Sequence, residues 1–94
     1  MQKKYRTKNG FIRRNIADSE VIIPIGNNVA NFNGFIELNS TAALIWDKLT
    51  QGSSKNEICE EMCSLFSVPR EEALSDLNEF FGLLLENKMI EETE

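Results

Sequence analysis

Few side chains of this sequence could carry out chemistry, and its two thiols are the first to consider. Cys59 and Cys63 are the only cysteines among the 94 residues, and they lie four positions apart in a stretch with helical spacing. Two cysteines do not make a disulfide framework, and they supply too few ligands for a structural zinc site. We interpret them as buried thiols, and we expect no metal and no cofactor.

The sequence contains no histidine. It therefore lacks the usual general base, the commonest metal ligand and the partner that activates a serine or cysteine nucleophile. Carboxylates and lysines remain, but we predict from this absence that the chain is not an enzyme.

Length and composition favour one small domain. With 94 residues, of which 41% are hydrophobic, the chain can form a single core with little margin for a second one. No stretch approaches the roughly 20 apolar residues that span a bilayer, and the first residues lead to no signal-like apolar segment. We therefore expect a cytoplasmic protein with no membrane partner.

Charge is distributed unevenly along the chain. Six basic residues and no acidic one lie within residues 1–14, whereas all 15 acidic residues follow them. We divide the chain into a basic arm, residues 1–10, and one domain, residues 11–91. The arm could be a solvated tail, could lie back on the acidic domain, or could steer an acidic partner.

The first half of the domain predicts three antiparallel strands. Residues 11–16 form the first and end at a turn around Asp18 and Ser19. The second covers residues 20–25, bends at Pro24, which cannot donate a hydrogen bond, and resumes over residues 29–32. A type I′ turn at Asn33 and Gly34 then leads into a short third strand, residues 35–38. The expected sheet is a twisted meander.

The second half predicts three helices. The first begins at Ser40, with Asn39 or Ser40 as its cap, and ends before Gly52. The second begins at Ser54, which together with Glu57 has the spacing of a capping box.

The third helix begins at Pro69 and runs to about Asn87. Met89 and Ile90 fold back over the core, and the acidic last residues fray. The fold class is therefore α+β, a three-stranded sheet followed by three helices, similar to a winged helix-turn-helix.

The last helix has more apolar surface than one core contact requires. Its apolar arc covers about 200°, where a surface helix needs a little over 100°. On one flank, Phe80 and Leu83 lie between the polar residues Asp76 and Asn87. This flank could meet the sheet, or it could form one wall of an open groove for an apolar ligand or a peptide.

Residues 38–46, Leu-Asn-Ser-Thr-Ala-Ala-Leu-Ile-Trp, resemble the Leu-Asn-x-Thr-Gly-Ala-x-Ile-Trp signature of the PqqD-like peptide chaperones. The hairpin before this motif and the two helices after it match the family in order and spacing, so that the resemblance covers about residues 10–91. One departure is Ala42, where the family usually has glycine. Alanine is the better helix former, so a small side chain is what this position requires.

The resemblance implies a recognition element that binds the leader of a ribosomally made precursor peptide and presents it to a modifying enzyme. In this family the leader adds as an antiparallel strand beside the third strand and lies against the third helix. The resemblance places the leader on two sets of residues of this chain. They are Phe35, Ile36, Glu37 and Leu38 on the strand, and Asp76, Phe80, Leu83 and Asn87 on the helix.

The partner enzyme expected from the resemblance is a radical S-adenosylmethionine enzyme, with the leader peptidase of a lasso-peptide pathway as the alternative. A function of a different class is a DNA-binding regulator, suggested by the winged-helix order of elements. Residues 70–88 contain five acidic and two basic residues, which argues against binding to phosphates. We therefore expect no nucleic acid partner, and a monomer or a weak homodimer paired through the edge strand.

Overall fold

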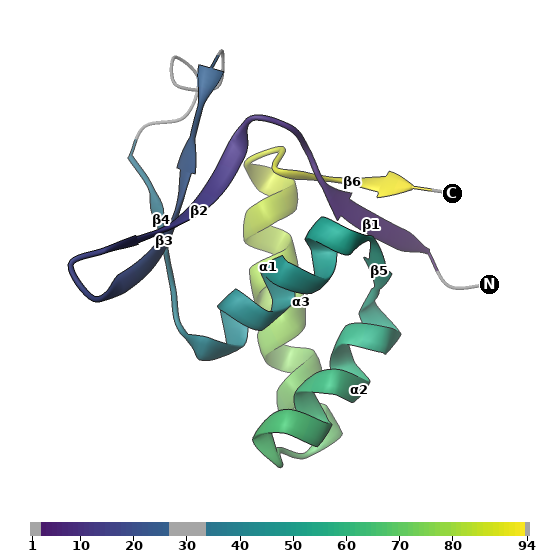
Figure 1. Ribbon diagram of the computed structural model, residues 1–94. Helices are drawn as coiled ribbons and strands as arrows, with labels where there is room; N and C mark the ends of the chain where they lie inside the picture. Colours follow the sequence, from purple (N-terminus) through teal and green to yellow (C-terminus); the bar gives the residue numbers. More distant parts are fainter. Residues whose placement is uncertain (1–2, 27–33, 94) are drawn as a thin grey trace.

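The computed structural model describes residues 3–26 and 34–93. It contains three helices and two small antiparallel sheets, which confirms the predicted α+β fold (Figure 1). The helices are α1 (Ser40–Gln51), α2 (Lys55–Phe66) and α3 (Arg70–Glu86). The strands are β1 (Lys4–Thr7), β2 (Phe11–Ile16), β3 (Ser19–Pro24), β4 (Ile36–Leu38), β5 (Ser53–Ser54) and β6 (Ile90–Thr93).

One sheet is the predicted meander, with the strand order β2-β3-β4. The turn between β2 and β3 lies one residue earlier than expected. Ala17 and Asp18 both have positive φ, 50° and 68°, as a type I′ turn requires, and Ile16 lies opposite Ser19. The predicted continuation of the second strand over residues 29–32, and Asn33 of the predicted turn, lie outside the described residues.

The helix ends follow the predicted caps. The side chain of Asn39 accepts a hydrogen bond from the Ala42 N–H at 2.8 Å, and Gly52 ends α1 with φ 84°. At the start of α2, the Ser54 Oγ accepts from the Glu57 N–H at 3.2 Å and the Glu57 carboxylate accepts from the Ser54 N–H at 3.0 Å. The capping box is therefore confirmed.

The second sheet was not predicted. Its order is β5-β1-β6, so that a strand within the basic arm forms its centre (Figure 1). Tyr5 of this strand contacts the Phe81 ring edge-on, with 5.2 Å between the ring centroids. The expectation that the residues after Ile90 fray is wrong, because residues 90–93 pair with β1 along its whole length.

One hydrophobic core joins the three helices to both sheets. Ile22 and Leu38 enter it from the first sheet, and Ile90 from the second. Met89 and Ile90 are buried, as predicted. No helix in the described ranges is long and apolar enough to cross a membrane.

The two thiols lie on the core side of α2. Cys59 is fully buried and Cys63 half-buried, and both are free. Burial raises the pKa of the Cys59 thiol, which keeps it protonated at neutral pH and unsuited to act as a nucleophile.

Candidate binding groove

β4 is an edge strand in the part of the chain that the structure describes. Its three residues pair only with β3, with Ile36 opposite Ile22 and Glu37 opposite Val21. An edge strand offers unpaired backbone groups to an incoming strand. The direction of the backbone groups of β4 determines which of them are free for such pairing.

The two-residue turn before β3 fixes this direction. In such a hairpin the residues that flank the turn, Ile16 and Ser19, form a hydrogen-bonded pair, and bonded and non-bonded pairs then alternate along the strands. Every second residue of β3 from Ser19 onward thus bonds to β2. The Ile25 N–H, which donates to the Gly10 carbonyl at 2.8 Å, continues this alternation beyond the strand.

The residues of β3 between them bond to β4. Glu20 and Ile22 therefore use their backbone groups on Leu38 and Ile36, which lie opposite them. The N–H and the C=O of Glu37 then point away from the sheet. One residue of β4 thus presents a donor and an acceptor to a further strand.

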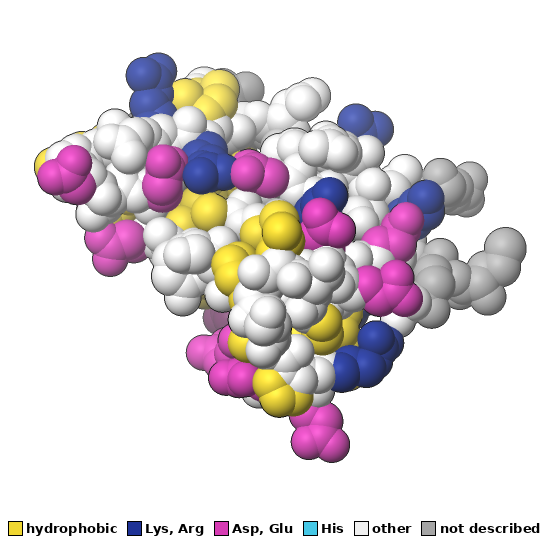
Figure 2. Space-filling model, turned by 60° about the horizontal axis from the view of Figure 1, so that its bottom comes forward, with side chains coloured by type: hydrophobic (Ala, Val, Ile, Leu, Met, Phe, Trp, Pro, Cys, Tyr) yellow, Lys and Arg dark blue, Asp and Glu magenta, His cyan; other side chains and the backbone are white. Residues whose placement is uncertain are grey.

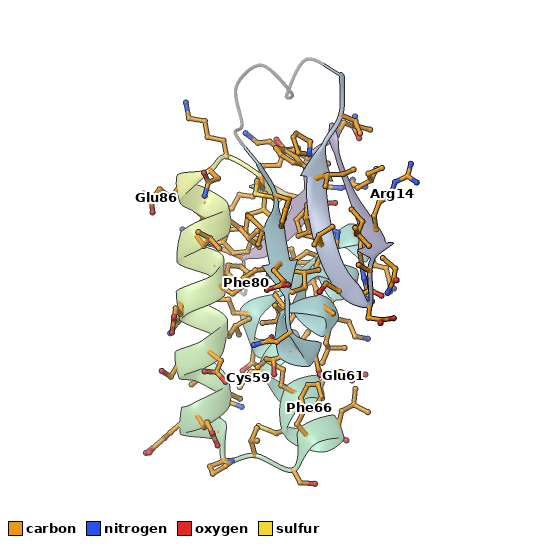
Figure 3. The ribbon with its side chains drawn as sticks, turned by 90° about the vertical axis from the view of Figure 1, so that its left-hand side faces the viewer. Arg14, Cys59, Glu61, Phe66, Phe80 and Glu86 are labelled. Carbon is orange, nitrogen blue, oxygen red and sulfur yellow. The ribbon has the colours of Figure 1, made fainter. Side chains whose placement is uncertain are left out.

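An open groove of about 680 Å³ runs along this edge. Its walls are β4, the first turns of α1 and one flank of α3, and Figure 3 shows Phe80 directed from α3 toward the sheet. The lining residues are Ile36, Glu37, Asn39, Thr41, Ala42, Ile45, Asp76, Asn78, Glu79, Phe80, Gly82, Leu83 and Glu86.

The apolar flank of α3 forms part of this groove. Phe80 is half-buried and packs against the core with one side, while Leu83 is 40% exposed. Both line the groove, opposite Ile36. Of the two interpretations of this flank, the geometry therefore favours the open groove.

Five of the eight predicted site residues line the groove, and three do not. Phe35 is 59% exposed and lies before β4, outside the lining. Leu38 is 6% exposed, because strand alternation turns its side chain into the core. Asn87 caps the end of α3, where its Nδ2 donates to the Leu83 carbonyl at 2.9 Å.

Sequence reasoning missed the contribution of α1 and the outer rim of α3. Thr41, Ala42 and Ile45 of α1 line the groove, although none of them was predicted to lie at the binding site. Ala42 carries a usable signal, since a small residue was expected there for close packing. Glu79 and Glu86 extend the rim of α3, and Figure 3 shows Glu86 on the side of α3 away from the sheet.

An ion-pair network holds the sheet against α1. Arg13 of β2 donates to Glu20 at 3.0 Å and to Asp47 of α1 at 2.5 Å. Hydrogen bonds from Asn15 and Arg13 lower the pKa of Glu20, and the bonds to Asp47 and Glu20 raise the pKa of Arg13. This contact fixes the sheet relative to α1, which lines the groove.

The groove itself is acidic. Its lining contains Glu37, Asp76, Glu79 and Glu86 and no lysine or arginine. Acidic side chains also outnumber basic ones on the face of the molecule that Figure 2 shows. The groove thus combines an open strand edge, an apolar wall and a negative rim.

These features agree with a known family. The family model "Coenzyme PQQ synthesis protein D (PqqD)" matches residues 20–90. The chain belongs to the PqqD family. The matched range includes β4, α1 and α3, so that every wall of the groove lies within the part of the chain that defines this PqqD protein.

Two solved structures are similar to this PqqD protein. "Lasso peptide synthetase B1 complexed with the leader peptide" is 25% identical, with a TM-score of 0.72, 93% of this chain and 96% of that chain covered. "TbiB1 in Complex with the TbiA(beta) Leader Peptide" is 22% identical, with a TM-score of 0.72 and 92% and 94% covered, and supports the fold alone. Comparison with curated proteins gives no match.

Proposed function

We propose that this chain is a peptide chaperone that binds the leader of a ribosomally made precursor peptide by strand addition to β4. The observation that carries the proposal is that the outward-pointing backbone of Glu37 and the apolar wall of Phe80 and Leu83 face one groove. Backbone hydrogen bonds would supply affinity, and alternate side chains of the leader would enter the groove.

Family membership supports this function, and so does the similar lasso peptide synthetase component, which is described as complexed with a leader peptide. The residues predicted to bind the leader therefore divide into two groups. Ile36, Glu37, Asp76, Phe80 and Leu83 line the groove and are proposed to contact the leader. Phe35 lies beside the same edge, and Leu38 and Asn87 hold the strand and the helix end in place.

The proposed role is non-catalytic. Membership of the PqqD family supports this role. The modifying enzyme would be a separate partner in the cytoplasm, either a radical S-adenosylmethionine enzyme or a leader peptidase. The likeness to a lasso peptide synthetase component favours the peptidase.

Leader peptides made from the short reading frames beside this gene would test the function. We expect one of them to bind the wild-type chain and to shift the amide NMR signals of Glu37 and Phe80. Leader binding that leaves both signals unchanged would place the site elsewhere. Self-association through β4 would appear instead as concentration-dependent shifts at Glu37 without any peptide.

A further inference from the structure

We infer that the leader segment held in this groove is cationic, with a lysine or arginine two residues before an apolar anchor. The inference rests on the proposed strand addition and extends it to the chemical class of the peptide. Three acidic side chains carry it: Asp76 and Glu79 on the helix wall of the groove, and Glu37, whose side chain lies on the outer face of the strand that forms the other wall.

These three carboxylates are exposed, and within the described residues none of them forms an ion pair. A peptide that covers the groove would remove water from them. Covering a charge without giving it a partner is costly, whereas a cationic side chain offsets that cost and an acidic one adds repulsion. The groove therefore discriminates against an acidic leader.

Basic residues of the chain itself are not placed to neutralise the groove. None of them lines it, and several are paired at other sites of the described chain. The ion pairs are Lys3–Glu92, Lys4–Glu57, Arg13–Glu20, Arg13–Asp47 and Lys48–Glu61. The positive charge must come from the bound peptide.

The spacing along α3 gives the spacing in the peptide. Asp76 and Glu79 lie within one turn of the helix, and the pair Phe80 and Leu83 lies within the next turn toward its end. At about 1.5 Å per helical residue, the midpoints of the two pairs are about 6 Å apart. Two residues of an extended strand span about 6.7 Å and place their side chains on the same face. A cation and an apolar anchor at positions i and i+2 thus match the two pairs.

The order of the two follows from the strand direction. β4 runs toward the start of α1, whereas α3 runs the opposite way (Figures 1 and 3). A strand added antiparallel to β4 therefore runs in the same direction as α3. The cation meets Asp76 and Glu79 first, and the apolar anchor reaches Phe80 and Leu83 after it.

The residue between them lies opposite Glu37. Strand alternation puts the Glu37 side chain on the face of the sheet opposite to Ile36 and Leu38. A peptide residue in a bonded pair with Glu37 has its side chain on that same face, where an opposite charge is favourable. The binding pattern is therefore Lys/Arg, then preferably Lys/Arg, then an apolar residue.

Display selection would test this without knowledge of the natural leader. A random library of 12-residue peptides is selected against the immobilised full-length chain. The same library is selected against Asp76→Asn/Glu79→Gln, which keeps side-chain size and removes two charges. The matched control is Glu71→Gln/Glu72→Gln, which removes two exposed charges from the first turn of α3 but outside the groove. A Glu37→Pro variant reports on strand addition.

The wild-type chain and the Glu71→Gln/Glu72→Gln control should enrich the cation-x-apolar pattern, and Asp76→Asn/Glu79→Gln should enrich the apolar residue alone. In the best peptide, exchange of the cation for glutamate should weaken binding about tenfold at low salt and less at high salt. Enriched peptides that need Glu37 but carry no cation would overturn the charge inference and leave strand addition standing. Peptides that bind Glu37→Pro equally well would overturn strand addition itself, and so would the lack of any enrichment.

Discussion

Glu37 and Phe80 form opposite walls of one groove, the first on the edge of the sheet and the second on α3. The two residues contribute in different ways. Glu37 offers backbone hydrogen bonds that any sequence can use, whereas Phe80 offers an apolar surface that selects side chains. Affinity and selectivity are therefore separable by substitution.

Glu37→Pro should abolish leader binding, because proline removes the outward-pointing N–H of β4. The bonds between β3 and β4 use Ile36 and Leu38, so the sheet should persist. Calorimetric titration with a leader peptide, together with thermal unfolding, measures both effects. Glu37→Ala is the control, since it keeps the N–H and removes only the carboxylate, so its loss of affinity should be much smaller than that of Glu37→Pro. Proline at Ile36 would not be informative, because it breaks a bond to β3.

Leu83→Ala should weaken leader binding by about 1–2 kcal/mol, because it removes apolar contact area mainly from the complex. Its effect on the free energy of unfolding should stay within about 1 kcal/mol, since Leu83 is 40% exposed. Leu85→Ala provides a matched control. Leu85 is 45% exposed on the same helix but does not line the groove, so equal losses of affinity in both variants would contradict the assigned wall.

Phe80→Ala should lower both affinity and stability, because Phe80 packs against the core and also lines the groove. We expect a loss of about 1–3 kcal/mol in the free energy of unfolding, less than the value typical of a fully buried phenylalanine. Denaturant unfolding and titration on the same sample separate the two effects. An affinity unchanged after correction for the folded fraction would assign Phe80 to the core alone.

Tyr5→Ala should destabilise the fold by about 1–3 kcal/mol, because Tyr5 packs edge-on against Phe81 in the centre of the second sheet. Tyr5→Phe keeps the ring and should be close to neutral. Thermal melts of the two variants decide whether this part of the basic arm belongs to the folded unit. A tail without structural role predicts two unchanged melting temperatures.

Stability should fall in acid, partly through Glu57. The Ser54 backbone N–H and hydroxyl, together with Lys4, lower the pKa of Glu57 below its ordinary value of 4.5. Because the folded-state pKa is the lower one, the contribution is complete above pH 4.5 and is lost as the pH falls through the folded-state pKa. Melting temperatures between pH 2.5 and 6 should fall less steeply in Glu57→Gln than in the wild-type chain. Parallel curves would assign the acid sensitivity to other carboxylates.

Local signals predicted most of the fold correctly. The caps at Asn39 and Ser54 depend on side chains within three residues of the groups they bond, so their spacing can be found in the sequence. The turn was predicted at Asp18 and Ser19 but lies one residue earlier, at Ala17 and Asp18. Aspartate is favoured at more than one turn position, and serine has only a weak preference for turns, so the sequence did not determine the exact position.

Non-local contacts were beyond such signals. β1 and β6 lie at opposite ends of the chain, and neither has an apolar run that predicts a strand. The groove posed the same difficulty. Phe80 and Leu83 were found from the width of the apolar arc, but Thr41 and Ala42 join the site only through the packing of α1 against α3. The distribution of charge along the sequence does not show that Glu37, Asp76 and Glu79 lie near one another. These residues come together at one groove only through the packing of α3 beside β4.

Lys4 pairs with Thr93, so the first and the last strand of the domain end side by side. Figure 1 shows this place on the opposite side of the molecule from β4. A domain with adjacent ends can be inserted into a loop of another protein without forcing apart the two ends of that loop. An enzyme that carried this domain as an insertion, or as a fusion at either end, would hold it by one attachment point and leave the groove accessible to its peptide.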